Sequence, residues 1–403
     1  MNMTDNKLAG RTELERYLVD RVDTAVAHHD ITVHYQPIIR TITGKICAFE
    51  ALARWEDPIY GMITPSVFLA VLETTRQTYK LDAAVVEEVC RMLSDRQSQG
   101  LPMFPVSLNL SRIDFLAGDF FDIVETAVNR YQVARNLLRI EVTENLLAAD
   151  TRIAASLRRF QEAGYSVLLD DFGQGNSSLN VLKNNQFEAL KIDLRFLAPF
   201  SPRAKNIIES VVCMAKKMGI HPLAEGVETQ EQVDFLTAIG CEQIQGFYYG
   251  RPMPMDNVLN HCAQKGILLE PIEAEDCLNA AGIYEFDNKS PMVLYALNNG
   301  KIRYLKVAAT FDTSLRLLGI ASRKDLAQQG SSAARDCLSA IRLGSMQAIK
   351  AGKEVTQSFC TQDALGLIEI VYISQYQQNR IFRCKLTTIP RTPSMDNFLL
   401  GNP

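Results

Sequence analysis

Short apolar runs alternate with amphipathic stretches along the first 250 or so residues. The runs are rich in β-branched residues and lie at 32–37, 46–53, 104–110, 137–142, 166–170, 188–192, 220–224 and 242–247. Most gaps after the second run have an apolar face at helical spacing, at 82–98, 151–163, 204–218 and 229–239. Strand–helix alternation predicts a parallel sheet, and eight such strands predict a TIM-type (β/α)8 barrel, an α/β fold of usually about 250 residues.

The start of the chain departs from this alternation. Residues 12–27 have an apolar face at helical spacing, with Thr12 and Glu15 placed as in a capping box, and predict a helix. The first two runs are separated mainly by turn residues, Thr41 to Lys45. A hairpin fits this short gap better than a helical crossover, so we expect one barrel strand to run antiparallel to the others.

The pattern changes after Pro252 and Pro254. We expect the barrel to cover 12–258, a helical connection to cover 259–280, and a smaller α+β domain to cover 281–390. Within that domain, VLYALNNGKIRYLKV predicts two strands around an Asn-Asn-Gly turn. Helical patterns follow at 313–319 and 333–351, and three strands are expected within 354–388.

The composition is that of a soluble globular protein, with 47% hydrophobic and 22% charged residues among 403. A net charge of −4 provides no basic footprint for duplex nucleic acid, although a metal ion can still attract a small anion. No apolar run reaches the roughly 18 residues of a membrane span, and no signal peptide is evident, so we expect a cytoplasmic protein. The nine cysteines form no C-x-x-C pair, which indicates reduced thiols.

Polar residues follow the apolar runs at the edge where a TIM barrel carries its catalytic groups. They are Glu50, Asn109, Glu141, Glu144, Asp170, Asp171, Lys191, Asp193, Glu225, Glu228 and Gln245. Acidic side chains that converge at one barrel mouth repel each other unless a cation lies between them. Oxygen ligands without histidine or cysteine favour Mg²⁺ or Mn²⁺, or else Ca²⁺, and two ions suit phosphoester hydrolysis.

Each of these residues also has an ordinary structural interpretation. A single glutamate at a strand end is often a solvated charge, and Asp170–Asp171 before Phe172-Gly173 could form only an Asx turn. Lys191 could simply pair with Asp193. Their recurrence at six successive strand ends favours a functional site, because solvated charges have no reason to keep to one edge of the barrel.

The same residues lie in motifs that resemble the EAL domain of cyclic di-GMP phosphodiesterases. FEALARW at 49–55 resembles the motif that names the family. The remaining motifs follow in order: HYQPI at 34–38, SLNLS at 107–111, IEVTEN at 140–145, LLDDFGQGNSSL at 168–179, LKID at 190–193, LAEGVET at 223–229 and IQGFYYGRPMP at 244–254. The resemblance covers roughly residues 14–258 and implies hydrolysis of cyclic di-GMP to linear pGpG.

The resemblance also implies roles for individual residues. It assigns one metal to Glu50, Asn109, Glu141 and Asp170, and a second metal to Asp170, Asp171 and Glu225. It implies that Lys191 contacts the attacking water and that Glu228 and Gln245 complete the catalytic site. The residues that it implies for substrate contacts are Gln36, Leu52, Arg54, Asp193 and Gln245. Glu144 would brace the loop after Asp171. We expect Mg²⁺ or Mn²⁺ to support turnover and Ca²⁺ to inhibit it, since its looser geometry places the water badly.

The sequence departs from the family in the loop after Asp171. Gln174 and Asn176 stand where the family commonly has Thr and Tyr, and 73–82 lacks the usual glycine and apolar residues. In the family this loop links the second metal to a dimer interface, so the expected homodimer is coupled less tightly to catalysis. The alternatives are a catalytically weak cyclic di-GMP receptor and a scaffold, and the complete set of ligands favours the enzyme. No GGDEF-type motif appears, so we expect no cyclase activity.

Residues 281–390 resemble a PAS-type sensor domain in the order of their elements. No histidine follows His261, which excludes haem ligated by histidine in this segment. A sensor of an unidentified ligand or partner and a packing or dimerisation module without a ligand are the two hypotheses that this order supports.

Overall fold

The computed structural model describes residues 3–116, 120–149, 151–173, 178–284 and 290–390. It divides into two compact units. The first comprises Met1–Val233 and Gln243–Ile272, and the second comprises Asp234–Glu242 and Glu273–Pro403. Gln174 and Asn176, on which the expectation about dimer coupling depends, lie outside the described residues. None of the described helices is both long and apolar enough to cross a membrane.

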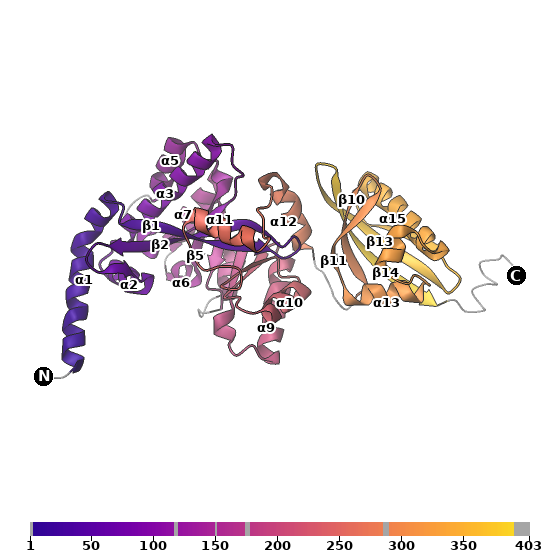
Figure 1. Cartoon of the computed structure of the whole chain (residues 1–403), viewed down its shortest axis with the longest axis horizontal. Helices are drawn as coiled ribbons and strands as arrows, with labels where there is room; N and C mark the ends of the chain where they lie inside the picture. The colour runs from indigo at the N-terminus through magenta and orange to yellow at the C-terminus, as the bar shows by residue number, and fades with distance from the viewer. Residues whose placement is uncertain (1–2, 117–119, 150, 174–177, 285–289, 391–403) are drawn as a thin grey trace. The chain divides into compact units, whose positions relative to one another are not determined.

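The first unit is built around eight strands that close into a barrel (Figure 1). They are β1 (Ile31–Arg40), β2 (Lys45–Asp57), β4 (Val106–Asn109), β5 (Leu138–Thr143), β6 (Ser166–Asp170), β7 (Ala189–Asp193), β8 (His221–Glu225) and β9 (Gln243–Gln245). Their order is β1-β9-β8-β7-β6-β5-β4-β2, and pairing of β2 with β1 closes the ring. β1 runs antiparallel to both neighbours and the others run parallel, so the predicted barrel with one antiparallel strand is confirmed.

Two details at this end of the unit differ from the sequence prediction. A short strand, β3 (Gly61–Ile63), extends the sheet beyond β2 and was not predicted. The first helix, α1 (Met3–Ala27), begins well before Thr12, so the predicted capping box does not mark its start. Leu18 and Val22 of α1 are fully buried in a cluster with Trp55 and Phe68, which explains why this helix packs against the barrel.

Helices surround the barrel in the gaps between strands. They are α2 (Pro65–Thr74), α3 (Thr78–Ser98), α4 (Arg112–Leu116), α5 (Phe120–Tyr131), α6 (Glu144–Ala149), α7 (Thr151–Ala163), α8 (Ser178–Asn184), α9 (Pro202–Lys217), α10 (Gln230–Ile239) and α11 (Met255–Gln264). The 3₁₀ turns are η1 (Arg135–Leu137), η2 (Leu194–Leu197) and η3 (Ile272–Ala274). Ser201 accepts the backbone N–H of Ala204 and so caps α9, with Pro202 in the first turn.

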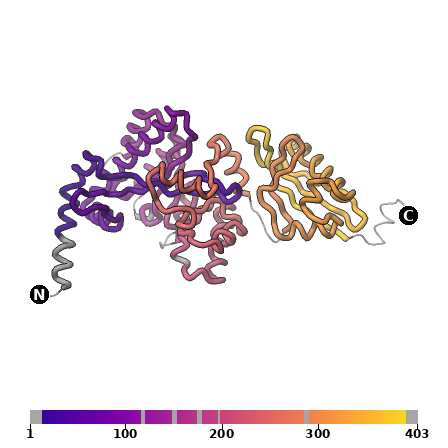
Figure 2. Tube along the Cα trace, viewed as in Figure 1, coloured from indigo at the N-terminus to yellow at the C-terminus, as the bar shows by residue number. Residues whose placement is uncertain are grey.

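The strand register determines which side chains meet at the mouth of the barrel. Asn109 at the end of β4 lies beside Glu141 of β5, and Asp193 at the end of β7 lies beside Glu225 of β8. Figure 2 shows β1 beside the segment after β9, where Tyr35 and Met253 exchange backbone hydrogen bonds of 2.7 and 3.1 Å. Parallel strands in register therefore bring polar residues from distant parts of the sequence to one edge.

The second unit contains a five-stranded antiparallel sheet. Its strands are β10 (Met292–Asn298), β11 (Lys301–Val307), β12 (Val355–Cys360), β13 (Ala364–Tyr376) and β14 (Asn379–Pro390), in the order β11-β10-β14-β13-β12. Asn299 and Gly300 have φ angles of 47° and 77°, which form the predicted hairpin turn between β10 and β11.

The described part of the second unit also contains the helices α12 (Glu275–Ile283), α13 (Ala309–Leu317), α14 (Arg323–Gln328) and α15 (Ser332–Ala351). α15 packs across β12 and β13 (Figure 1), and its Leu338 and Ile341 share a core with Ile368 and Phe382. The predicted smaller α+β domain is confirmed, although the helix expected at 313–319 begins earlier, at Ala309. The resemblance to a PAS domain stays a prediction.

Candidate active site at the barrel mouth

A buried lysine stands among four carboxylates inside the mouth of the barrel. Lys191 of β7 has no exposed surface. Its Nζ lies 2.5 Å from Glu141 Oε2, 3.5 Å from Glu50 Oε1, 3.5 Å from Asp170 Oδ1 and 3.6 Å from Glu225 Oε1. These carboxylates come from β2, β5, β6 and β8. The barrel therefore brings together five of the residues that the sequence predicted for the site.

The carboxylates outnumber the cation, and the local electrostatics reflect this. Burial alone would lower the pKa of Lys191, but the surrounding carboxylates, Asp170 first among them, raise it well above its usual range. Burial raises the pKa of Glu141 to about 8, against the opposing effect of Lys191. Burial also raises the pKa of Glu225 well above its usual range. The protein thus contains more buried negative charge here than Lys191 can compensate.

Amide side chains from the neighbouring strands β1, β4 and β9 hold one member of this cluster, Glu50. Gln245 Nε2 of β9 donates to Glu50 Oε2 at 2.6 Å and to Gln36 Oε1 at 3.0 Å. Gln36 Nε2 of β1 donates to the carbonyl of Gly250 at 3.2 Å, and Asn109 Nδ2 donates to Glu50 Oε1 at 2.8 Å. Glu50 is therefore held from both sides, which fixes its carboxylate relative to Lys191.

The turn after β6 is shaped by its two aspartates. Asp171 has a φ angle of 56°, a left-handed conformation that aspartate tolerates better than most residues. Its backbone N–H donates to Asp170 Oδ1 at 2.8 Å, and burial raises the pKa of the Asp171 carboxyl. Glu144 is almost completely buried and accepts the N–H of Gly173 at 3.4 Å. This contact is the one expected of a residue that braces the turn, and the role itself stays a prediction.

Other predicted residues lie outside the Lys191 cluster. Asp193 accepts hydrogen bonds from Arg195 Nε and Nη2, at 2.9 and 2.7 Å, and not from Lys191. Arg54 Nη1 donates to the carbonyl of Ala53 at 2.7 Å, and Leu52 is half-buried on the same strand. Glu228 is exposed after β8, where its backbone N–H donates to Gln232. The described contacts do not bring its side chain to Lys191.

The donor set at the mouth fits hard divalent cations. Glu141 Oε1 is buried and has no hydrogen-bond partner among the described residues, so one oxygen of this carboxylate is left to bind a cation. The available ligands are carboxylates and one amide, the chemistry that Mg²⁺ and Mn²⁺ prefer. Within the described ranges no three acidic, imidazole or thiol side chains already form a metal site. The Lys191 ammonium stands between the carboxylates instead, so metal binding requires these side chains to reorient.

Two features of this region were not found in the sequence. Arg195 binds Asp193 but lies two residues beyond the LKID motif, so the motif does not indicate it. Asp82 of α3 and Asp114 of α4 form a buried acid pair near the segment that carries Asn109. Burial raises the pKa of Asp114 to about 6 and the pKa of Asp82 well above its usual range. Because these acids lie 32 positions apart, no local sequence signal joins them.

The comparisons with known proteins agree with this geometry. A family model described as the EAL domain matches residues 19–252, more than half of the chain. The bifunctional diguanylate cyclase/cyclic di-GMP phosphodiesterase MucR of Pseudomonas aeruginosa is 31% identical over 258 residues, which are 63% of this chain and 38% of MucR. The cyclic di-GMP phosphodiesterase NbdA of the same organism is 32% identical over 252 residues, which are 62% of this chain and 32% of NbdA.

A solved structure extends the comparison to three dimensions. The structure titled PaMucR phosphodiesterase, c-di-GMP complex, is 33% identical with a TM-score of 0.57, and the match covers 60% of this chain and all of that one. The chain thus spans only about a third of the length of these two curated relatives, whereas the solved phosphodiesterase fragment is matched completely.

Proposed function

The chain belongs to the EAL domain family, and from this premise we propose that it is a metal-dependent phosphodiesterase that hydrolyses cyclic di-GMP to linear pGpG. The observation that carries the proposal is the completely buried Lys191 among four carboxylates at the mouth of the barrel. Charge of this kind is costly to bury and is retained where function needs it. The names of MucR and NbdA, and the cyclic di-GMP complex of the matched phosphodiesterase, support the substrate.

The residues that would hold two divalent ions are the oxygen donors of the mouth: Glu50, Asn109, Glu141, Asp170, Asp171 and Glu225. Bound there, Mg²⁺ or Mn²⁺ would supply Lewis-acid activation of water and neutralisation of charge at the phosphorus. Asp170 is the last residue of β6, and Asp171 begins the turn that follows. The two adjacent carboxylates therefore lie at one strand end. Glu141 contributes a buried oxygen without a partner among the described residues.

The remaining steps belong to side chains of the protein. Lys191 stays protonated because its carboxylate neighbours raise its pKa, and its ammonium orients the attacking water and stabilises negative charge on the phosphate oxygens. Gln245 donates to both Glu50 and Gln36, and these hydrogen bonds hold the two side chains in place beneath the proposed substrate site. Arg54, with Leu52 beside it on β2, would meet the phosphodiester, because the planar guanidinium suits two phosphate oxygens. Asp193 is proposed to contact the substrate, and Glu228 to complete the catalytic site.

Hydrolysis by the purified full chain tests the proposal. Cyclic di-GMP is incubated with Mg²⁺, Mn²⁺, Ca²⁺ or chelator, and the products are separated by chromatography. We expect linear pGpG with Mg²⁺ or Mn²⁺, little with Ca²⁺ and none with chelator. Asp170→Asn removes a proposed ligand and should abolish product, whereas the exposed Asp122→Asn on α5 should not. Absence of product under every condition would refute the proposed activity.

A measurement of cyclic di-GMP binding, made beside this assay, distinguishes an enzyme from a receptor. Binding of cyclic di-GMP without turnover, in the presence of Mg²⁺, would favour the catalytically weak receptor. We further propose that the chain acts as a homodimer and that the second unit regulates turnover. Removal of residues 273–403 should then change the hydrolysis rate, and sedimentation should give twice the mass of one chain.

A further inference from the structure

An exposed guanidinium lies at the mouth of the barrel, beside the Lys191 cluster. Arg195 follows β7 by two residues, in the 3₁₀ turn η2, and 72% of its side chain is exposed. Its Nε donates to Asp193 Oδ1 at 2.9 Å, and its Nη2 donates to Asp193 Oδ2 at 2.7 Å. Because Asp193 is only 4% exposed, a buried carboxylate holds this exposed cation in one orientation.

The fold places Arg195 where β7 and β8 end. Side chains two positions apart on a strand point to the same side, so Asp193 points into the barrel as Lys191 does, one layer nearer the mouth. The stem of Arg195 passes over the turn after β8, since a β-carbon at Gly226 would lie 3.2 Å from Arg195 Cγ. The absence of a side chain at position 226 therefore leaves room for the arginine at the mouth.

Two proposed metal ligands lie within electrostatic range of this guanidinium. The hydrogen bonds to Asp193 are the main cause that raises the pKa of Arg195, and the negative charges of Glu225 and Asp171 raise it further, against the opposing effect of burial. The charge of Arg195 in turn counteracts the rise in the pKa of Asp171, which burial causes first. Arg195 therefore stays charged, and a phosphodiester bound at the second proposed metal comes close to it.

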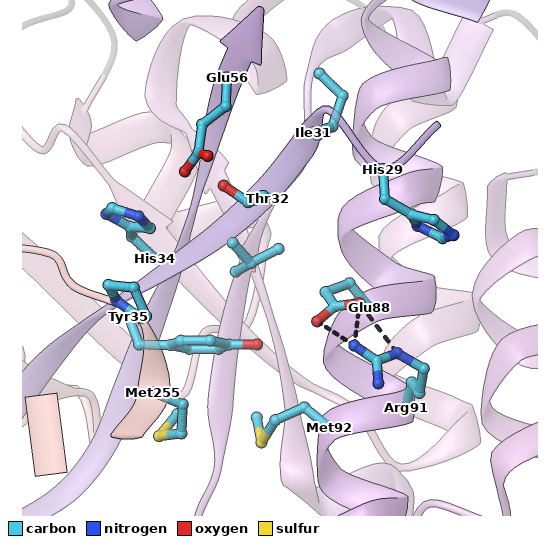
Figure 3. Close-up of a pocket in the computed structure, with 12 residues that line it drawn as sticks. His29, Ile31, Thr32, His34, Tyr35, Glu56, Glu88, Arg91, Met92 and Met255 are labelled. Carbon is cyan, nitrogen blue, oxygen red and sulfur yellow. Dashed lines mark hydrogen bonds and ion pairs between the residues drawn. The ribbon is translucent and has the colours of Figure 1, made fainter. Parts of the chain in front are cut away.

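One edge of the guanidinium is available to a ligand. The Nε–Nη2 edge is bound to Asp193, whereas Nη1 has no hydrogen-bond partner among the described residues. Arg91 of α3 differs, although 51% of its side chain is exposed. Figure 3 shows Arg91 bound to Glu88, through Nε and Nη2, and its Nη1 donates to Asp95 at 3.3 Å. Arg195 thus presents two adjacent donors, Nη1 and Nη2, that the described fold does not use together.

We propose that Arg195 is a further substrate-binding residue, whose Nη1–Nη2 edge donates to two adjacent acceptor atoms of cyclic di-GMP. The inference rests on the proposed function, because it takes cyclic di-GMP as the substrate. Two parts of this molecule present such a pair of acceptors, namely the non-bridging oxygens of a phosphodiester and the O6 and N7 atoms of guanine. Asp193 orients the arginine and so supports the substrate site through it.

Calorimetric binding of cyclic di-GMP to the full chain tests the inference, with Ca²⁺ present because little turnover is expected with this ion. Arg195→Ala removes both donors and should weaken binding about tenfold. Arg195→Lys keeps the charge but not the pair of donors, and should recover only part of the loss. In hydrolysis with Mg²⁺, Arg195→Ala should raise KM by a similar factor while kcat stays within about twofold, because the contact is made both before and during the reaction.

A substrate analogue shows which acceptor pair is bound. In this analogue both guanines of cyclic di-GMP are replaced by 7-deazaguanine, which removes N7 and leaves the phosphodiesters intact. If guanine is bound, Arg195→Ala should weaken binding of cyclic di-GMP but hardly that of the analogue. If a phosphodiester is bound, Arg195→Ala should weaken binding of both by about the same factor. Arg195→Lys takes the place of Arg195→Ala in this comparison if circular dichroism shows that the alanine variant is unfolded.

Arg135→Ala is the matched control. Arg135 donates to Glu125 through Nε at 2.8 Å and through Nη2 at 2.7 Å, as Arg195 does to Asp193. It lies just before β5, at the end of the barrel opposite the mouth, so its loss should leave binding and KM unchanged.

Three results would overturn the inference alone while wild type still binds and hydrolyses cyclic di-GMP. They are equal binding by wild type and the Arg195 variants, an equal loss in Arg135→Ala, and a loss confined to kcat, which would show that Arg195 acts only on the carboxylates of the mouth. A wild type that neither binds nor hydrolyses cyclic di-GMP would refute the proposed function and this inference together.

Discussion

Two buried charged clusters at different ends of the barrel are organised in opposite ways. Near the amino-terminal ends of the parallel strands, Glu270 has both oxygens occupied, one by Arg40 Nε at 2.9 Å and the other by the Thr43 hydroxyl. At the mouth, four carboxylates share the ammonium of Lys191, and Glu141 retains an oxygen without a partner among the described residues. A carboxylate that is fully hydrogen-bonded supports the fold, whereas a surplus of carboxylates points to a ligand of opposite charge.

Loss of the lysine should give the largest effect. Lys191→Ala is expected to reduce kcat by roughly 10²–10³-fold, because the ammonium that orients the attacking water and stabilises charge on the phosphate oxygens is lost. In chelator the variant should also unfold more easily, since the carboxylates lose their shared counter-charge. Measured kcat and thermal unfolding, with Lys205→Ala on α9 as the control, check both effects. A normal kcat would show that Lys191 only neutralises the cluster.

Breaking the contact between Arg40 and Glu270 should affect stability alone. Arg40→Met leaves Glu270 buried without its cation and is expected to cost about 3–5 kcal/mol of unfolding free energy. The kcat of the folded fraction should stay unchanged, because Arg40 lies far from the mouth along β1. Urea unfolding measures the loss. The double variant Arg40→Met with Glu270→Leu should recover most of it, and a failure to recover would mean that Arg40 stabilises the barrel through other contacts.

The pair of Asp82 and Asp114 extends the comparison of the two charged clusters to a third case, in which two acidic side chains interact with each other. Burial raises the pKa of Asp114 to about 6, so the folded state binds a proton more tightly than the unfolded state. Stability from this group is therefore present below the unfolded pKa of about 4 and is lost as the pH rises through about 6. Asp114→Asn cannot ionise, so it should gain on the order of 1–3 kcal/mol relative to wild type between pH 4 and pH 8.

Urea unfolding at several pH values measures this difference. The exposed Asp122→Asn serves as the control and should follow wild type at every pH. A constant difference between Asp114→Asn and wild type from pH 4 to pH 8 would contradict a shared proton in the pair.

The smallest effect concerns the surplus charge itself. Of the four carboxylates around Lys191, Glu225→Gln removes the one that lies farthest from it, at 3.6 Å. Burial first, and then repulsion from Asp170, raise the pKa of Glu225 well above its usual range. In chelator at neutral pH this change should stabilise the protein by about 0.5–2 kcal/mol, while hydrolysis is lost. Calorimetric unfolding checks the gain. A destabilised variant would mean that the four carboxylates are compensated already in the absence of metal.

The sequence predicted the features that repeat along the chain. The strand ranges, the antiparallel hairpin and the polar residues at the mouth follow from periodicity and from the shared edge of parallel strands. It did not predict the Arg40–Glu270 contact or the acid pair, because their partners lie far apart and no spacing rule connects them. β3 was not predicted because three residues are too few to show the alternation of a strand. The start of α1 at Met3 was not predicted because the regular apolar spacing begins only later in this helix.

Glu228 shows the opposite limit of the sequence argument. Glu225 is the last residue of β8 and Glu228 follows three positions later, but the chain turns between them at Gly226, with a φ angle of 70°. A side chain at position 226 would meet Arg195 at 3.2 Å, so the turn is tight and directs Glu228 outwards. A shared motif therefore does not by itself show which side chains converge.

Manganese binding measured by electron paramagnetic resonance tests the central claim most directly. The account predicts saturable binding of about two Mn²⁺ ions per chain, lost in Asp170→Asn and retained in the double variant of Arg40 and Glu270. Absence of saturable binding by the wild type, or equal binding by Asp170→Asn, would contradict the claim that the surplus carboxylates of the mouth are metal ligands.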